Sequence, residues 1–328
     1  MSRKLLSYTA LGLILGNAAI ADVPKVAVDI APVHSLVSRV MEGVGSPKLI
    51  IPAGASPHEY SLRPSEAKSL QDADMVIWMG EDLAPWMENS IEKLAKNAEV
   101  ITLLEASETK LLDFREGALF EEHDHGDHDD HDDHDDHDKD HDDHDDHDDH
   151  DDHAGHDHGE HDPHAWLSIE NAQTWLNLVA GKLSAADPEN AGVYFGNAAA
   201  ARSEIEELSK EVNSILDPVR GRSFVVFHDA DQYFETSFDF PASGAISLGD
   251  ATDPSASRIA EIQGRVREEG INCVLSEPQY NPNLVETVLE GTDAKTGVID
   301  PLGVNLEPGS KLYGDLIRNM AKSLAGCL

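Results

Sequence analysis

Positively charged residues are scarce in this chain of 328 residues, which has 24 Lys and Arg against 63 Asp and Glu and a formal charge of −39 at pH 7. This balance excludes a nucleic-acid-binding protein, because no basic face is available to displace counterions from phosphates. Cysteine is also scarce, at 2 residues, and the pair is not spaced as Cys-x-x-Cys. A metal site built from cysteine thiolates is therefore not expected.

Long apolar runs are missing except near the start of the chain. Leu5–Leu15 is apolar, follows two basic residues, and precedes the small-residue pattern Ala19-Ile20-Ala21. The run is too short to span a bilayer comfortably, so we predict a signal peptide over 1–21, cleaved after Ala21, rather than an anchoring helix. No Cys lies at the cleavage site to carry a lipid. We therefore expect a soluble protein exported to the periplasm of a Gram-negative cell.

Acidic residues and histidines are concentrated in one segment, Glu121–Asp162. Its 42 residues contain 23 acids, one Lys and 14 of the 18 His, so it carries −22 while the other 286 residues carry −17. Within it, 123–161 consists mostly of His-Asp-Asp triplets with almost no apolar residue to bury, which predicts disorder without metal. Imidazole and carboxylate both bind divalent cations such as Zn²⁺, so we expect this loop to bind several such ions weakly, in addition to any specific site elsewhere in the chain. A solvated spacer is the alternative.

The remaining sequence alternates between strand-like and helix-like segments. Four strand-like runs precede the His/Asp-rich segment, and four more follow it in the same order, with helix-like segments between them. We therefore predict an α/β fold with two lobes, each a four-stranded, mostly parallel sheet flanked by helices. The predicted strands lie at 25–30, 47–51, 75–79, 100–104, 223–227, 244–248, 271–275 and 297–299. The predicted helices of the lobes lie at 32–42, 65–71, 83–97, 254–269, 282–290 and 310–325.

A long amphipathic segment separates the two sets of strands. Asp187 is a favourable N-cap before Pro188, and apolar residues recur at helical spacing up to about Leu216. About 30 helical residues would span about 45 Å, enough to join both lobes as one long rigid helix and to limit hinge opening. We expect an N-terminal lobe over 22–186, a linking helix over 187–217 and a C-terminal lobe over 218–328.

Four histidines lie outside the His/Asp-rich segment, and three of them share a setting. His58 follows one predicted strand, His164 opens a helix, and His228 follows another strand. Open α/β sheets bind ligands beyond the carboxyl ends of their strands, so residues of both lobes would converge on one cleft. Asp300 follows a strand in the same way. Three imidazoles with a carboxylate or water satisfy tetrahedral Zn²⁺, so these four residues are the predicted ligands.

The sequence leaves more than one candidate for the fourth ligand and more than one role for the neighbouring polar residues. Asp300, Glu59 beside His58, or a water molecule would complete the coordination. Glu277 is expected to make a polar contact between the lobes or to orient a metal-bound His. The remaining histidine, His34, falls inside a predicted helix, where packing or capping explains it. The four Trp residues are expected to pack in the cores or between the lobes.

The two cysteines, Cys273 and Cys327, are expected to pair in an oxidising compartment. Cys273 lies in a predicted strand and Cys327 is next to the C-terminus. A disulfide would therefore tie the last helix to its lobe, stabilising the fold by roughly 4 kcal/mol in the chain-entropy treatment. Two free thiols are the alternative.

Four short motifs occur in order along the mature chain. They are Gly54-Ala-Ser-Pro-His-Glu-Tyr60 with Arg63-Pro64, Asp162-Pro-His-Ala-Trp-Leu167, Phe227-His-Asp-Ala230 and Ile299-Asp-Pro-Leu302. With the His-rich insertion before the second motif, they resemble the zinc-binding solute receptors of ABC importers, the ZnuA type. The resemblance implies two (β/α)4-type lobes joined by a long helix, with zinc held between them by His58, His164 and His228. In that family Asp300 would be a ligand or lie just beyond a water.

The same resemblance implies partners and marks one departure. Receptors of this kind deliver their ion to a membrane permease that works with a cytoplasmic ATPase. The cysteine pair also resembles that of the disulfide-bearing members. Pro57 departs from members that carry an acid immediately before the first His, which puts an acidic ligand from that side in doubt.

These observations together predict a monomeric periplasmic receptor, not an enzyme, that captures Zn²⁺ with high affinity and delivers it to an ABC importer. A manganese or iron receptor of the same fold is one alternative, although those ions favour more oxygen ligands than three His provide. A zinc buffer or a zinc hydrolase is the other. The sequence has no His-Glu-x-x-His motif to supply a general base beside the metal.

Overall fold

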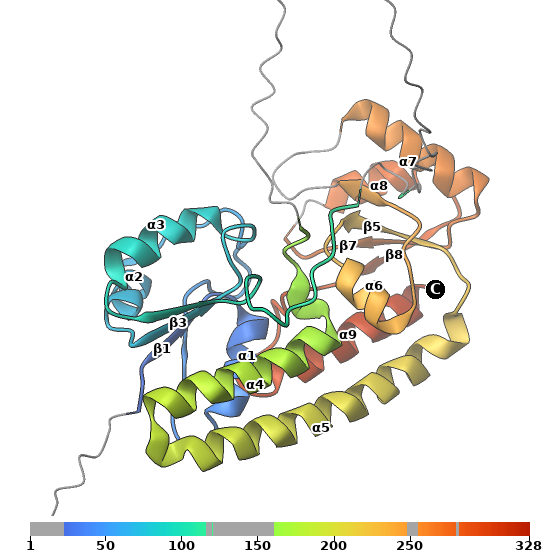
Figure 1. The fold of residues 1–328 in the computed structure, drawn as a ribbon. Helices are drawn as coiled ribbons and strands as arrows, with labels where there is room; N and C mark the ends of the chain where they lie inside the picture. Colours follow the sequence, from blue (N-terminus) through green and yellow to red (C-terminus); the bar gives the residue numbers. More distant parts are fainter. Residues whose placement is uncertain (1–22, 116–119, 121–160, 248–254, 280–281) are drawn as a thin grey trace, which may run out of the picture.

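The structure is a computed structural model, shown in Figure 1, that describes residues 23–115, 120, 161–247, 255–279 and 282–328. The predicted signal peptide over 1–21 lies outside the described residues. So does the predicted metal-binding loop, apart from its last two residues. Within the described part, no helix is both long enough and apolar enough to cross a membrane.

The first lobe contains a four-stranded sheet with the strand order β2-β1-β3-β4. All neighbouring strands are parallel. The central strands β1 and β3 consist of buried apolar residues, as expected for strands covered by helices on both faces. The strands are β1 (Val26–Val28), β2 (Lys48–Leu49), β3 (Met75–Trp78) and β4 (Glu99–Thr102), and the helices between them are α1 (Ala31–Val40), α2 (Pro64–Gln71) and α3 (Pro85–Leu94).

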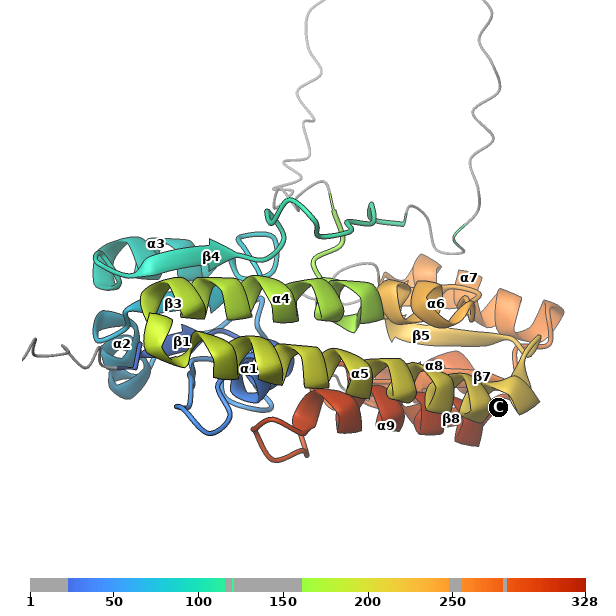
Figure 2. The same ribbon diagram turned by 60° about the horizontal axis from the view of Figure 1, so that its bottom comes forward.

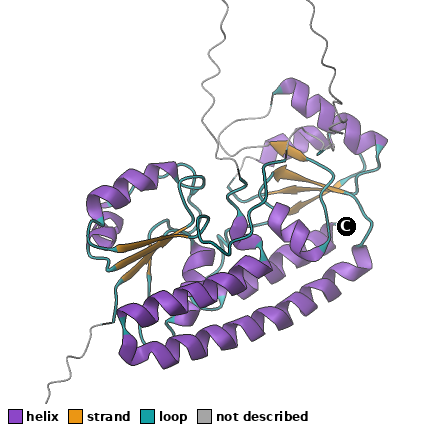
Figure 3. Ribbon diagram, in the orientation of Figure 1, coloured by secondary structure: helices purple, strands orange, loops and turns teal. Residues whose placement is uncertain are grey.

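The second lobe repeats this topology with the order β6-β5-β7-β8, again with parallel neighbours. Figure 3 shows the two sheets lying apart, each with helices against it. The predicted pair of four-stranded α/β lobes is confirmed. The strands are β5 (Phe224–His228), β6 (Ala245–Ser247), β7 (Cys273–Ser276) and β8 (Lys295–Val298), and the helices are α6 (Gln232–Phe238), α7 (Ala256–Glu268), α8 (Pro282–Leu289) and α9 (Leu312–Cys327).

Two long helices, α4 (Ile169–Ala186) and α5 (Ala191–Leu216), run side by side beneath both lobes (Figures 1 and 2). The predicted long helix between the lobes is therefore confirmed, and α4 accompanies it as a second support. Short 3-10 helices lie before α4 and on either side of α5, namely η1 (Ala165–Leu167), η2 (Pro188–Asn190) and η3 (Asp217–Val219). Bending of this base would have to disturb the packing of α4 against α5.

The start of α5 differs from the predicted helix start. Pro188–Asn190 forms a 3-10 turn, and the α-helix begins only at Ala191. Asp187 does not cap the helix as expected. Its buried carboxylate instead accepts hydrogen bonds from the Tyr194 hydroxyl at 2.8 Å and from the Asn190 amide at 2.7 Å. Helix α6 was not predicted, because it is only seven residues long and follows a strand directly.

One apolar core continues from the first lobe through α4 and α5 into the second lobe. It includes residues of β1 and β3, the inner faces of the two long helices, and residues of β5 and α9. Two smaller clusters lie on the outer faces of the sheets, beneath α2 and α3 in the first lobe and beneath α7 and α8 in the second. A shared core opposes wide separation of the lobes, since opening would expose apolar surface to water.

The predicted disulfide between Cys273 and Cys327 is present, with Cα atoms 5.7 Å apart. It joins β7 to the end of α9, and both residues are buried. The last helix is thus covalently tied to the second sheet, as the sequence indicated.

Candidate metal centre

Three histidines from separate segments meet at the junction of the two lobes. His228 is the last residue of β5, His164 immediately precedes η1, and His58 lies in the loop between β2 and α2. The ring centres of His164 and His228 are 4.9 Å apart, and that of His58 lies 5.6 Å from His164 and 6.4 Å from His228. The structure therefore brings together the three predicted ligands, although they are up to 170 residues apart in the sequence.

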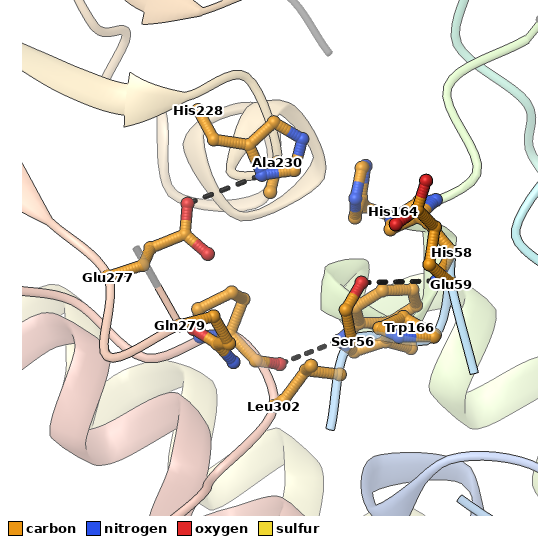
Figure 4. A pocket seen from close by; sticks show the side chains of 12 residues that line it. Ser56, His58, Glu59, His164, Trp166, His228, Ala230, Glu277, Gln279 and Leu302 are labelled. Carbon is orange, nitrogen blue, oxygen red and sulfur yellow. Dashed lines mark hydrogen bonds and ion pairs between the residues drawn. The ribbon is translucent and has the colours of Figure 1, made fainter. Parts of the chain in front are cut away.

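A cavity of about 240 Å³ lies between these rings (Figure 4). Both lobes contribute to its walls. Glu59 lines it beside His58, Glu277 lines it beside His228, and the indole of Trp166 lies across from Gln279. Imidazoles and carboxylates around one small cavity are suited to a divalent cation.

His164 is fixed by Asp162, two residues before it. Nδ1 of His164 lies 2.7 Å from Oδ1 of Asp162, and the same oxygen accepts the backbone N–H of His164 at 2.9 Å. Burial lowers the pKa of His164 well below its usual value, and the nearby His228 lowers it further. Burial also raises the pKa of Asp162 to about 7. A neutral imidazole whose Nδ1 faces a carboxylate keeps Nε2 available for a metal.

His228 has the same kind of partner in Glu277. Nδ1 of His228 lies 3.3 Å from Oε1 of Glu277, and both side chains are buried. Burial lowers the pKa of His228 to about 4, against the opposing influence of Asp229 and Asp162. Both deep imidazoles are therefore neutral at neutral pH, which is the form that binds metal ions. Figure 4 shows the other ring nitrogen of His228 directed toward His164.

The His58 loop is less buried than the segments that carry His164 and His228. The Trp86 indole N–H donates to the carbonyl of Pro57 at 2.8 Å, and the Tyr60 ring packs edge-on against Trp86 at 5.8 Å between centres. The Tyr60 hydroxyl donates to the Glu66 carboxylate at 2.9 Å. His58 itself is half-buried, whereas His164 and His228 are only 4% exposed. Of the three segments, this loop has the most room to adjust.

The present spacing is slightly wider than a bound ion would require. A metal about 2.0–2.1 Å from each ring nitrogen would lie about 3.2 Å from each ring centre, so tetrahedral ligands would have ring centres about 5 Å apart. The His164–His228 separation of 4.9 Å fits, and those of His58 exceed it, at 5.6 and 6.4 Å. Accordingly, among the described residues no three His, Cys, Asp or Glu side chains converge closely enough to hold an ion as they stand.

Asp300 lies just outside this group. Its Oδ1 accepts the backbone N–H groups of Leu302 and Gly303 at 3.2 and 2.8 Å, and its Oδ2 accepts that of Val304 at 2.7 Å. The carboxylate thus closes the turn after β8, and the neighbouring Pro301 and Leu302 line the cavity. Asp300 is near enough to Glu277 to raise the pKa of that acid, which burial already holds well above its usual value.

The other residues singled out in the sequence have structural contacts. His34 is buried in α1, and its Nε2 lies 3.3 Å from the Pro47 carbonyl. Trp166 is buried at the lobe junction as expected, and its indole N–H donates to the Pro301 carbonyl at 2.8 Å. Trp78 and Trp175 are also buried, and each donates to a threonine hydroxyl.

Sequence reasoning missed one charged residue beside the site. Arg115 reaches the residue after His228, where its guanidinium pairs with Asp229 and also with Glu235. Nothing in its local sequence distinguishes Arg115, which lies in the segment between β4 and η1 and outside the four motifs. Asp229, by contrast, belongs to the Phe-His-Asp-Ala motif and could have been noted as a polar residue at a strand end.

Comparison with known proteins shows which family the chain resembles. The sequence model of one protein family, the periplasmic zinc-uptake complex component A, ZnuA, matches residues 26–327. The chain is 47% identical over 326 residues to the high-affinity zinc uptake system protein ZnuA of Paracoccus denitrificans, covering 98% of each chain. It is 46% identical over 314 residues to the protein of that name from Brucella abortus, covering 95% of this chain and 94% of the relative.

Solved structures share the fold at lower identity. A crystal structure of ZnuA superposes with a TM-score of 0.72 at 19% identity, covering 93% of this chain and 99% of the other. A Mn-bound periplasmic metal binding protein from Candidatus Liberibacter asiaticus superposes with a TM-score of 0.69 at 19% identity, covering 92% and 98%. Because the family model spans nearly the whole described chain and the curated relatives match along their full lengths, the chain belongs to the zinc-uptake complex component A family, ZnuA.

Proposed function

We propose that this protein is a periplasmic receptor that captures Zn²⁺ in the interlobe cleft and delivers it to an ABC importer. The observation that carries the proposal is the meeting of three imidazoles, from His58, His164 and His228, around one small cavity. Three nitrogen ligands in a tetrahedral arrangement suit zinc. Membership of the zinc-uptake family supports the same function, with a membrane permease and its cytoplasmic ATPase as partners.

His58 would complete the site by a small movement of its loop. Two of the ring separations match tetrahedral spacing or come close to it, and the third exceeds it by more than 1 Å. The fourth ligand would be Asp300, Glu59 or a water molecule. Glu59 lines the cavity, whereas Asp300 lies outside its lining and already accepts backbone N–H groups on both carboxylate oxygens.

Release would follow from loop rearrangement more than from wide opening of the lobes. The continuous core and the paired helices α4 and α5 oppose domain separation, whereas His58 lies half-buried in a loop outside that core. A docked permease could therefore lower zinc affinity by displacing this loop, because losing one of three nitrogen ligands weakens the whole site.

Calorimetry and thermal melting of His58→Ala, His164→Ala and His228→Ala test the site. We expect each variant to lose tight zinc binding and the zinc-dependent rise in melting temperature, which follows from mass action. His34→Ala is the matched control, because it removes an imidazole from α1 outside the cavity. Tight binding retained in all three cleft variants would overturn the assignment.

Selectivity decides between zinc and the manganese alternative. A receptor of the same fold has been solved with Mn bound, although at 19% identity this shows only the shared fold. Competition between Zn²⁺ and Mn²⁺ under anaerobic, chelator-controlled conditions should favour zinc strongly, since manganese prefers oxygen ligands. Equal binding, or preference for Mn²⁺, would contradict the zinc assignment. A hydrolytic assay with the zinc-loaded protein would test the enzyme alternative.

The His/Asp-rich segment would supply additional weak Zn²⁺ sites that raise the ion concentration beside the cleft. Support comes from its composition, and from His161 being only three residues from His164. Deleting 123–161 should leave cleft affinity unchanged while reducing uptake at the lowest zinc supply. Unchanged uptake under that condition would remove the capture role and favour a buffer or spacer.

The remaining organisation is proposed on the same basis. Export through a cleaved signal peptide at 1–21 would place the protein in the periplasm, which agrees with the family description. The mature chain would be a monomer with lobes at 22–186 and 218–328 and a linking helix at 187–217. N-terminal sequencing and light scattering of the secreted protein test these points.

A further inference from the structure

Arg115 forms a largely buried charge cluster beside the cleft. Its Nε lies 3.1 Å from both carboxylate oxygens of Asp229, and its Nη1 and Nη2 donate to Glu235 at 2.6 and 3.0 Å. The arginine side chain is 15% exposed and each acid 4%. A planar guanidinium that bridges two buried carboxylates fixes their positions more narrowly than a lysine could.

Through Asp229 the cluster reaches the turn that carries His228. Asp229 lies between His228 and Ala230, both of which line the cavity. The backbone N–H of Ala230 donates to the carbonyl of His228 at 2.9 Å, so the turn is tight. Glu235 is anchored in addition by the N–H of Ala242 at 2.9 Å. Movement of the Arg115 guanidinium would therefore be transmitted directly to the His228 turn.

The segment that carries Arg115 is also bound to the His164 side of the site. The backbone N–H of Asp162 donates to the Leu112 carbonyl at 2.8 Å. The Tyr233 hydroxyl of α6 accepts the N–H of Leu112 at 2.9 Å and donates to the carbonyl of Asp162 at 3.0 Å. In Figure 1 this segment leaves the first lobe after β4 and crosses to α6 in the second. One strap of chain, residues 112–115, thus contacts the supports of two of the three imidazoles.

We propose that Arg115 is a positioning residue for metal binding: by clamping Asp229 and Glu235 to the 112–115 strap, it sets the position of His228 relative to His164. This inference rests on the proposed function, because the distance it fixes matters only if the two imidazoles share an ion. The positive charge of Arg115 would by itself oppose the binding of Zn²⁺ nearby, so a positioning role explains why an arginine lies there.

The sign of the mutational effect separates positioning from electrostatics. Removing a positive charge near the cleft should strengthen Zn²⁺ binding if Arg115 acts only through its charge. Loss of positioning should weaken binding, as loss of a group that orients metal ligands typically costs about 10- to 100-fold in affinity. Arg115→Met removes both the positive charge and the paired hydrogen bonds of the guanidinium. Arg115→Lys keeps the charge but removes the paired hydrogen bonds.

The experiment measures Zn²⁺ affinity by chelator competition, and the d–d absorption of bound Co²⁺, in wild type and both Arg115 variants. We expect at least a tenfold loss of zinc affinity in both variants, the lower end of the usual range for such groups, and a changed Co²⁺ spectrum, with circular dichroism unchanged. Arg39→Met is the matched control, because Arg39 also makes a bidentate pair, with Glu204, but on α1 away from the cleft. Glu235→Gln, which keeps the shape of the acid and weakens one arm of the clamp, serves if Arg115→Met does not fold.

The outcomes distinguish this inference from the proposed function. Tighter binding in Arg115→Met with no change in Arg115→Lys would show a purely electrostatic effect and refute positioning. Wild-type affinity and an unchanged Co²⁺ spectrum in Arg115→Lys and Glu235→Gln would refute it as well. If the wild-type protein itself binds no zinc, or binds it without the three histidines, the proposed function fails and the clamp has nothing to position.

Discussion

Replacing Glu277 with Gln is a stringent test of how the second lobe presents its ligand. Glu277 directly follows β7, is 6% exposed, and places Oε1 3.3 Å from Nδ1 of His228. Gln keeps the size of the side chain and a carbonyl acceptor, but it cannot supply the carboxylate that, once ionised, favours a proton on Nδ1 of the metal-bound imidazole. Since loss of such a partner costs about 10- to 100-fold in metal affinity, zinc binding should weaken by about 1.4–2.7 kcal/mol.

The same substitution should affect the metal-free protein in the opposite direction. Burial, with a contribution from Asp300, raises the pKa of Glu277 well above its usual value. A carboxyl whose pKa is raised in the folded state favours folding at low pH, and this contribution is lost as the pH rises through the folded value. The glutamine side chain does not ionise, so the metal-free variant should be at least as stable as wild type at neutral pH. Affinity falls while the melting temperature is kept or raised.

A double-mutant cycle with His228→Ala identifies the route of the effect. Zinc affinities of wild type, both single variants and the double variant are measured by competition with a chromogenic chelator. If Glu277 acts by orienting His228, then Glu277→Gln should cost nothing further once His228 is absent. An equal cost in both backgrounds would refute this reasoning and make Glu277 a direct ligand. No cost in either background would reduce Glu277 to a contact between the lobes.

Three further predictions concern stability and the His58 loop. Replacing both Cys273 and Cys327 with Ala opens a link between residues 54 apart and should cost about 4 kcal/mol in denaturant unfolding, with zinc affinity nearly unchanged; an equal loss of affinity would show that the disulfide shapes the site. Burial raises the pKa of Asp29 from 3.8 to about 7, so the free energy of unfolding should fall as the pH rises between these values, by up to about 1.4 kcal/mol per pH unit from this group. Asp29→Asn should remove this contribution to the slope, and a slope equal to that of wild type would contradict the prediction. Trp86→Phe removes the hydrogen bond to Pro57 and should weaken zinc binding about fivefold, whereas Trp78→Phe, which removes a bond to Thr102, should not; equal effects would deny the Trp86 contact a specific role.

The fold could be predicted because its signals are local. Strands such as Met75–Trp78 and Phe224–His228 are short apolar runs bounded by polar segments, and both are central and buried in the structure. Alternation of such runs with amphipathic helices implies parallel sheets, whatever the details of packing. The start of α5 was harder to predict, because Asp187 accepts from the Tyr194 hydroxyl further along the chain and not from the backbone it was expected to cap.

The contacts around the site could be predicted only in part, because they depend on chain segments that meet through tertiary structure. Asp162 is two residues from His164, so its proximity is visible in the sequence. Arg115 and Glu277, in contrast, are 114 and 49 residues from the partners they contact, Asp229 and His228. No periodicity or spacing relates residues at such distances. Arg115 reaches the cleft through tertiary contacts of the 112–115 strap with α6 and with Asp162.

The two lobes share a topology but use it differently, and this difference locates the adjustable part of the site. β1 and β5 occupy equivalent central positions, where the chain crosses to one neighbour and then the other, and where open sheets bind ligands. β5 ends in the proposed ligand His228, whereas β1 is followed by Asp29, whose carboxylate accepts the N–H groups of Ile30 and Met79 at 2.7 and 2.6 Å. In the first lobe, the residue at the end of the central strand therefore stabilises the backbone of its own lobe. Besides His164, this lobe brings His58 to the cleft, from a half-buried position in the loop nine residues beyond β2. Zinc affinity should accordingly be most sensitive to changes in the first lobe's loop, and it is there that a docked permease would act with least cost to the fold.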